Sequence, residues 1–98
     1  MRQRKPFRRI DVEFARTIIN RGETLVLDVR DAASFAQSHI DGARHLVQSE
    51  LGVLIGSIAK DRLVLIYCNG GYASLELAQA FSDFGFQEVY SLDGGYGA

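Results

Sequence analysis

The chain has 98 residues, of which 47% are hydrophobic and 23% are charged, as is typical of one small globular domain. Its formal net charge of −1 provides no overall attraction to nucleic acid or to a membrane surface, so we expect it to bind neither. Cys68 is the only cysteine and cannot form an internal disulfide, and no apolar run has the length of a membrane span, so we expect a cytoplasmic protein.

The first nine residues carry five basic side chains around the only proline. We expect residues 1–9 to form a flexible, solvated leader or linker, followed by one domain over residues 10–98. The alternative is an arm that contacts an acidic partner or nucleic acid.

The first elements alternate between helix and strand. Asp11 is placed to cap a helix with apolar residues on one face, and Gly22 is placed to end it. The nearly unbroken apolar run 24–29 predicts a buried strand of a parallel sheet. A short helix over 33–37, with Asp31 as its cap, follows.

The middle of the chain continues this alternation. Residues 39–42 predict a turn and residues 43–47 a short strand. A helix is expected over 49–59, although it contains two glycines that weaken the pattern. Residues 63–67 give the strongest strand signal in the chain.

The last elements are a helix over 74–84, ended by Gly85, and a strand over 88–92. Strands that alternate with helices at this spacing predict an α/β fold. We expect a small, mostly parallel sheet of about four to five strands with helices on both faces.

Cys68 directly follows the strongest predicted strand, at the sheet edge where ligands bind in such folds. The two adjacent glycines after it, Gly70 and Gly71, let successive backbone N–H groups turn toward one point, and a helix begins near Ser74. These donors favour a thiolate with a lowered pKa, which is a nucleophile. The alternative is a cysteine buried as a small hydrophobic residue.

Four motifs, in order and at matching intervals, resemble the single-domain rhodanese (thiosulfate sulfurtransferase-like) family. They are Leu27-Asp28-Val29-Arg30; Phe35 with Ser38-His39-Ile40-Asp41-Gly42-Ala43; Ile66-Tyr67-Cys68 with Gly71 and Ser74; and Val89-Tyr90 with Leu92-Asp93-Gly94-Gly95. Asp41 stands where the family usually has proline. The resemblance covers nearly the whole chain from about Ile10.

This resemblance implies a sulfurtransferase without a cofactor. Cys68 would take sulfane sulfur from a donor such as thiosulfate, become a persulfide, and pass the sulfur to cyanide or a thiol. A sulfur-relay protein or a fused domain is a further conceivable partner. By the same analogy, the substrate-binding loop comprises Asn69, Gly70, Gly71, Tyr72, Ala73 and Ser74.

The loop departs from the family pattern in its charge. Many members have arginine before the loop serine and often a cation after the cysteine, where this chain has Ala73 and Asn69. The missing cations should weaken binding of the thiosulfate dianion by about one to two decades, while a persulfide depends on backbone donors. A phosphatase, as found among some rhodanese-fold proteins, needs that arginine and is disfavoured.

Other polar residues have two interpretations each. Asp28 and Arg30 could contact substrate or brace the loop through a salt bridge, and Arg30 is the first candidate for the missing cation. His39 and His45 could act as base or metal ligands, but their spacing is no metal signature, so we expect hydrogen-bonded structural histidines.

Residues near the end of the site have less defined roles. Tyr72 could line the pocket mouth or pack inward, and Gly94 and Gly95 predict a tight structural turn. Family members usually continue past the position of Ala98, so we expect a truncated domain or one cut from a longer protein.

Two further functions stay open beside the sulfurtransferase. The chain could be a non-catalytic sulfur-binding or redox-sensing module that takes persulfide from a partner protein. It could also be an inactive structural domain whose cysteine is no more reactive than a free one.

Overall fold

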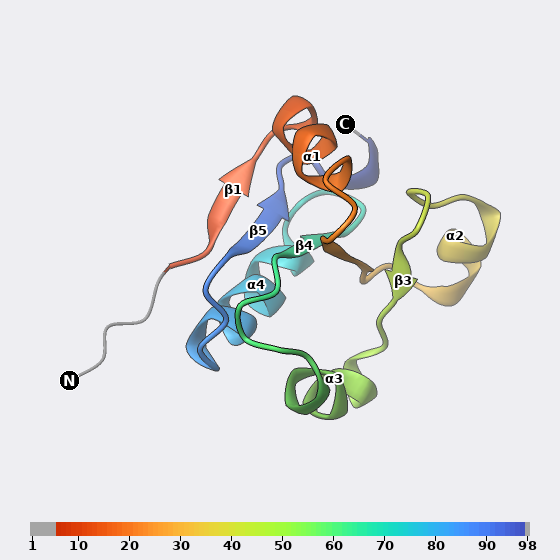
Figure 1. Ribbon diagram of the computed structural model, residues 1–98. Helices are drawn as coiled ribbons and strands as arrows, with labels where there is room; N and C mark the ends of the chain where they lie inside the picture. The colour runs from red at the N-terminus through yellow and green to blue at the C-terminus, as the bar shows by residue number, and fades with distance from the viewer. Residues whose placement is uncertain (1–5, 98) are drawn as a thin grey trace.

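The computed structural model describes residues 6–97 as one α/β unit (Figure 1). Helices and strands alternate along most of the chain. The elements are β1 (Arg8–Ile10), α1 (Val12–Ile19), β2 (Leu25–Asp28), α2 (Ala32–Gln37), β3 (Arg44–His45), the 3₁₀ helix η1 (Gln48–Glu50), α3 (Leu51–Ser57), β4 (Val64–Tyr67), α4 (Ala73–Asp83), β5 (Val89–Leu92) and the 3₁₀ helix η2 (Gly95–Gly97).

The strands form one five-stranded sheet in the order β1-β5-β4-β2-β3, and every neighbouring pair is parallel. The prediction of a small parallel sheet is therefore confirmed. β4 lies at the centre between β2 and β5, and all four of its residues are buried. Because the strands are parallel, their carboxyl ends meet at one edge, and the loop after β4 begins in the middle of that edge.

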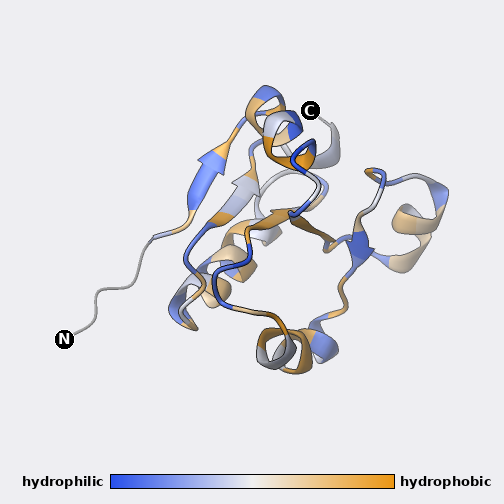
Figure 2. Ribbon diagram, viewed as in Figure 1, coloured by the Kyte–Doolittle hydropathy of each residue, from blue (hydrophilic) through white to orange (hydrophobic). Residues whose placement is uncertain are grey.

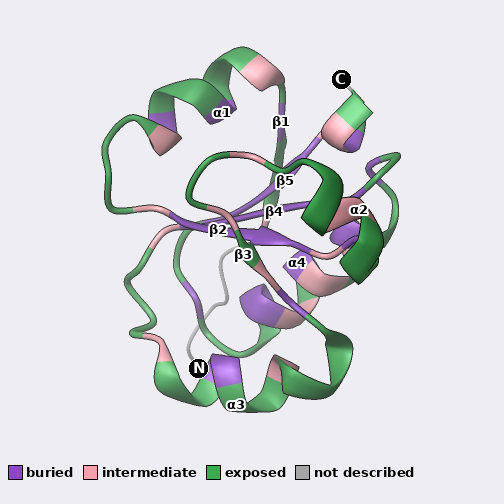
Figure 3. Ribbon diagram, turned by 90° about the vertical axis from the view of Figure 1, so that its right-hand side faces the viewer, coloured by how far each residue is buried: buried purple, intermediate pink, exposed green. Residues whose placement is uncertain are grey.

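Alternate residues of the central strands pack on opposite faces of the sheet. Val64 and Ile66 join the cluster on the side of α3 and α4, whereas Leu65 and Tyr67 join the cluster on the side of α1. Figure 3 shows the sheet nearly edge-on, with α1 on one face and α3 and α4 on the other. Two hydrophobic cores thus fix β4, and with it the start of the loop that follows.

The predicted helix caps are present. Asp11 accepts a hydrogen bond from the backbone N–H of Phe14, and Asp31 accepts one from that of Ser34. The single helix expected over 49–59 is wrong in detail, because the segment starts as η1, continues as α3 and becomes extended at Ile58. Gly52 and Gly56 lower the helix propensity there, and no side chain caps either helix.

The boundary of the leader also needs correction. Arg8 and Arg9, expected in the flexible segment, form β1 with Ile10 and pair with β5. Ile10 is buried, and Arg9 forms an ion pair with Asp93 at 2.7 Å, so the arginines occupy an edge strand where charged side chains reach solvent. Residues 1–5 of the expected leader lie outside the described residues.

Hydropathy separates the edges of the sheet from its centre. The edge strands β1 and β3 are hydrophilic and β4 is hydrophobic (Figure 2). None of the helices formed by residues 6–97 combines the length and the apolar character needed to cross a membrane.

Two phenylalanines near the end of α4 test the importance of the core under this helix. Phe81 is fully buried, whereas Phe84 is 62% exposed. Phe81→Ala should lower the free energy of unfolding by about 3–5 kcal/mol through lost burial and a cavity, and Phe84→Ala should change it by no more than about 0.5 kcal/mol. Urea denaturation of both variants measures the difference, and equal losses would contradict this core.

Candidate active site

Cys68 is the first residue after β4, and the loop 69–72 joins it to the start of α4 at Ala73. The residue is only 4% exposed, while Asn69 and Gly70 next to it are exposed. The predicted position at the carboxyl edge of the sheet is therefore found, with the sulfur beneath an exposed loop.

Backbone donors converge on the sulfur of Cys68. The N–H of Gly71 donates to Sγ at 3.1 Å and the N–H of Ser74 at 3.4 Å, while the hydroxyl oxygen of Ser74 lies 3.5 Å from Sγ. Gly71 has a φ of +88°, a conformation that glycine adopts without strain, and after it the chain turns into α4, which contains Ser74. Ser74 belongs to the first turn of α4, so the positive end of the helix dipole also faces Cys68.

These contacts decide the acidity of the thiol. Burial raises the pKa of Cys68, but the hydrogen bonds from Ser74, Gly71 and Ala73 together lower it by more, so the pKa lies below its usual value. Segment 68–74 contains no Lys, Arg or His. Backbone and hydroxyl donors, rather than a cation within the loop, therefore favour the thiolate form of Cys68.

The terminal turn packs directly against this loop. A Cβ on Gly95, whose φ is +66°, would overlap the carbonyl groups of Cys68 and Asn69, and a Cβ on Gly71 would lie 2.9 Å from the backbone nitrogen of Gly94. The N–H of Tyr96 donates to the carbonyl of Cys68 at 2.7 Å. The predicted structural turn thus also supports the backbone of Cys68, a contact that the sequence did not reveal.

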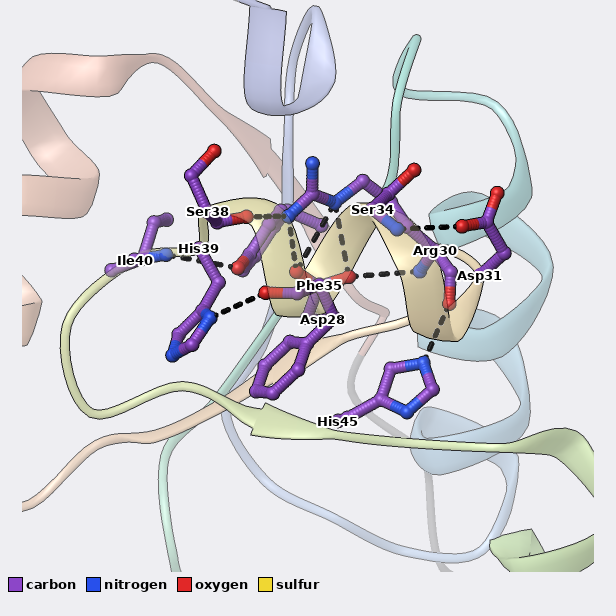
Figure 4. A network of polar contacts seen from close by, with 10 residues as sticks. Asp28, Arg30, Asp31, Ser34, Phe35, Ser38, His39, Ile40 and His45 are labelled. Atoms are coloured by element: carbon purple, nitrogen blue, oxygen red, sulfur yellow. Dashed lines mark hydrogen bonds and ion pairs between the residues drawn. The ribbon is translucent and has the colours of Figure 1, made fainter.

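Asp28 and Arg30 form a buried ion pair at the end of β2 (Figure 4). The guanidinium donates through Nε and Nη2 to the carboxylate, with the shortest contact at 2.7 Å, and Nη2 also donates to the carbonyl of Ser38 at 2.6 Å. Burial raises the pKa of Asp28, but the hydrogen bonds from Arg30 and Tyr67 outweigh it, so the pKa falls below its usual value. The pair is a brace between β2 and the 38–42 turn.

The guanidinium of Arg30 also lies over two aromatic rings, 4.1 Å from the centroid of Tyr96 and 5.6 Å from that of Tyr67. Burial and a hydrogen bond to Asp28 raise the pKa of Tyr67 to about 12, and its hydroxyl accepts from the N–H of Ile40. The charge of Arg30 is already neutralised by its ion pair with Asp28. Contact of Arg30 with substrate, in place of a loop cation, stays a prediction.

The two histidines have the hydrogen bonds expected of structural residues. Nδ1 of His39 contacts the carbonyl of Phe35 at 2.7 Å, and its ring stacks on the Phe35 ring at 3.8 Å. Nε2 of His45 contacts the carbonyl of Arg30 at 2.7 Å (Figure 4). Within residues 6–97 there is no group of three or more His, Cys, Asp or Glu side chains that could hold a metal ion.

Tyr72 is 80% exposed, which contradicts the alternative that it packs inward. Its ring lies beside Gly70, since a Cβ on Gly70 would be 3.6 Å from it. Ala73 is also exposed, so Tyr72 and Ala73 present an uncharged rim next to Cys68.

The sequence analysis missed Ser91. This residue of β5 is 1% exposed, and its hydroxyl lies 2.7 Å from that of Ser74. The only available signal was a serine at an inward position of an otherwise apolar strand, and its partner lies 17 residues away in sequence.

Comparisons with known proteins identify relatives by sequence and by fold. The family model described as "Rhodanese-like domain" matches residues 11–98. "Thiosulfate sulfurtransferase GlpE" of Stutzerimonas stutzeri is 41% identical over 90 residues, which cover 92% of this chain and 82% of the relative; that of Shewanella oneidensis is 42% identical over 73 residues, covering 74% and 72%. The crystal structure of a rhodanese-like domain protein from Staphylococcus aureus has a TM-score of 0.79 at 20% identity, covering 93% of this chain and 89% of that one.

Two glycines with left-handed backbones test the contact between the terminal turn and the carbonyls of Cys68 and Asn69. Gly85→Ala should cost about 1–2 kcal/mol of backbone strain alone, because nothing lies within 4 Å of the position that a Cβ would take there. Gly95→Ala should cost about 1–3 kcal/mol more, because the new methyl group displaces the Cys68 and Asn69 carbonyls, and it should slow alkylation of Cys68 by iodoacetamide. Denaturation and alkylation measure both effects, and identical behaviour of the two variants would contradict the contact.

Proposed function

Since the chain belongs to the rhodanese-like domain family, we propose that it is a sulfurtransferase that carries sulfane sulfur as a persulfide on Cys68. The observation that carries this proposal is the convergence of the Gly71 and Ser74 N–H groups on Sγ of Cys68. The relatives named thiosulfate sulfurtransferase, at about 40% identity, support the same reaction class.

The proposed reaction has two steps. The Cys68 thiolate attacks the outer sulfur of a donor such as thiosulfate; a new S–S bond forms, and sulfite leaves with the electron pair of the broken S–S bond. An acceptor such as cyanide or a thiolate then attacks the outer sulfur of the persulfide, and the Cys68 thiolate leaves with the bonding electrons. Neither step requires a redox cofactor, because the donor and the acceptor supply all the atoms and electrons.

The loop can stabilise both the Cys68 thiolate and the persulfide anion of this cycle. The N–H groups that point to Sγ of Cys68 would also face the charge that moves to the outer sulfur of the persulfide. Donors at fixed backbone positions need no reorganisation when that charge develops. The loop from Asn69 to Ser74 would therefore bind the donor anion and the persulfide in turn.

A second candidate function follows from the uncharged loop. Asn69 and Ala73 supply no cation, and Arg30 is paired with Asp28. Loss of one charge-assisted hydrogen bond to thiosulfate would cost about 1.5–3 kcal/mol of binding free energy. A module that receives persulfide from a partner protein, without turnover of small donors, would not require that cation.

Replacement of Cys68 tests the sulfurtransferase. Cys68→Ala and Cys68→Ser should abolish thiosulfate:cyanide activity, because Cys68 is the only cysteine and no other thiol can carry the sulfur. Steady-state kinetics with both substrates measure the loss, and circular dichroism checks that the variants fold. Activity that survives in Cys68→Ala would contradict the proposal.

Intact-mass spectrometry separates the two candidate functions. After incubation with thiosulfate, the sulfurtransferase should gain the mass of one sulfur atom, and cyanide should remove it. The module should gain the same mass only from a protein or small-molecule persulfide and should show no cyanide turnover. A protein that gains no sulfur from either donor would contradict both functions.

A further inference from the structure

Cys68 contacts a pair of buried, hydrogen-bonded serines through Ser74. Ser74 is fully buried and Ser91 is 1% exposed, and their hydroxyl oxygens are 2.7 Å apart. They lie between α4 and β5, beside buried apolar residues such as Ala78, Phe81 and Val89. Two hydroxyls in an apolar interface must satisfy each other or a further polar group.

Strand alternation fixes the side on which Ser91 lies. Its neighbours Tyr90 and Leu92 pack in the cluster on the α1 face, so the side chain of Ser91 points to the opposite face, toward α4. In the sheet, Ser91 pairs with Ile66 of β4, two residues before Cys68. The fold therefore places the Ser91 hydroxyl next to that of Ser74, which in turn lies next to the sulfur of Cys68.

The number of protons decides the direction of this chain of contacts. Each serine hydroxyl has one proton to donate and accepts up to two. When Cys68 is a thiolate it has no proton, so in the 3.5 Å contact only Ser74 can donate. Once Ser74 donates to the sulfur, its 2.7 Å contact with Ser91 requires Ser91 to be the donor.

We propose that Ser91 is a positioning residue that donates its proton to Ser74 and thereby directs the Ser74 hydroxyl toward the sulfur of Cys68. This inference rests on the proposed role of Cys68 as a thiolate. Hydrogen bonds in such a chain polarise one another, so Ser91 also strengthens the bond that Ser74 makes to sulfur. Without Ser91, the hydroxyl of Ser74 would lose its hydrogen-bond donor.

The other titratable groups around Cys68, Ser74 and Ser91 do not direct the Ser74 hydroxyl toward the sulfur. Each is either engaged elsewhere or exposed, and the causes of the lowered Cys68 pKa are hydrogen bonds from Ser74, Gly71 and Ala73 against burial. The groups are Asp28, paired with Arg30; Tyr67, bonded to Asp28 and Ile40; Asp93, paired with Arg9; Tyr90, bonded to Glu88; and the exposed Glu76.

Spectroscopic titration of the Cys68 thiolate tests this inference without any sulfur transfer. Ser74→Ala should raise the thiol pKa by about one unit, and Ser91→Ala by about half a unit. Ser91→Thr and Ser91→Val have nearly the same shape, but only the first keeps a hydroxyl. Ser91→Thr should retain the wild-type pKa, whereas Ser91→Val should shift it as Ser91→Ala does.

Two comparisons distinguish positioning from a general loss of packing. Ser82→Ala removes a buried serine about two turns further along α4 and should leave the thiol pKa unchanged. The double variant Ser74→Ala/Ser91→Ala should shift the pKa no more than Ser74→Ala alone, because Ser91 acts only through Ser74.

Additive shifts, or an unchanged pKa in both Ser91→Ala and Ser91→Val, would overturn the inference. A shift in Ser82→Ala equal to that in Ser91→Ala would overturn it as well. Since these titrations need only a free thiol, they can fail while the sulfurtransferase proposal holds, and they can succeed if the protein transfers no sulfur.

Discussion

A sulfur atom in a nearly closed position can remain charged only if hydrogen-bond donors replace the water it has lost. At Cys68 the N–H groups of Gly71 and Ser74 provide this replacement, and no cation within segment 68–74 shares the task. Both donors must lie within about 3.5 Å of one point, which requires the left-handed backbone at Gly71 and the start of α4 immediately behind the loop. The local sequence supplies both conditions within a few residues of the cysteine.

The remainder of the fold holds that short loop in place. Gly95 allows the terminal turn to lie against the carbonyls of Cys68 and Asn69, and the N–H of Tyr96 donates to the first of them. The ring of Tyr96 lies under the guanidinium of Arg30, which Asp28 neutralises. Removal of one partner of such a buried pair costs about 3–5 kcal/mol, so the ion pair is a structural support for the site.

The sequence predicted the strands well because a strand buried on both faces leaves a nearly continuous apolar run, as in β2 and β4. It also predicted where Cys68 and its loop lie in the fold, since strand, cysteine, glycines and helix are consecutive. It failed at β1, where two arginines on an edge strand look like part of a basic leader. It could not identify Ser91 or the contact of Gly95, because both depend on segments that meet only when the parallel sheet has formed.

The central claim is that the folded loop, without a cation of its own, keeps Cys68 as a thiolate. The most direct measurement is the pH dependence of its alkylation by iodoacetamide, compared with the same cysteine in an unfolded peptide of residues 64–74. The lowered pKa predicts that the folded protein reaches half of its maximal rate at a lower pH than the peptide does. A midpoint at or above that of the peptide would contradict the account.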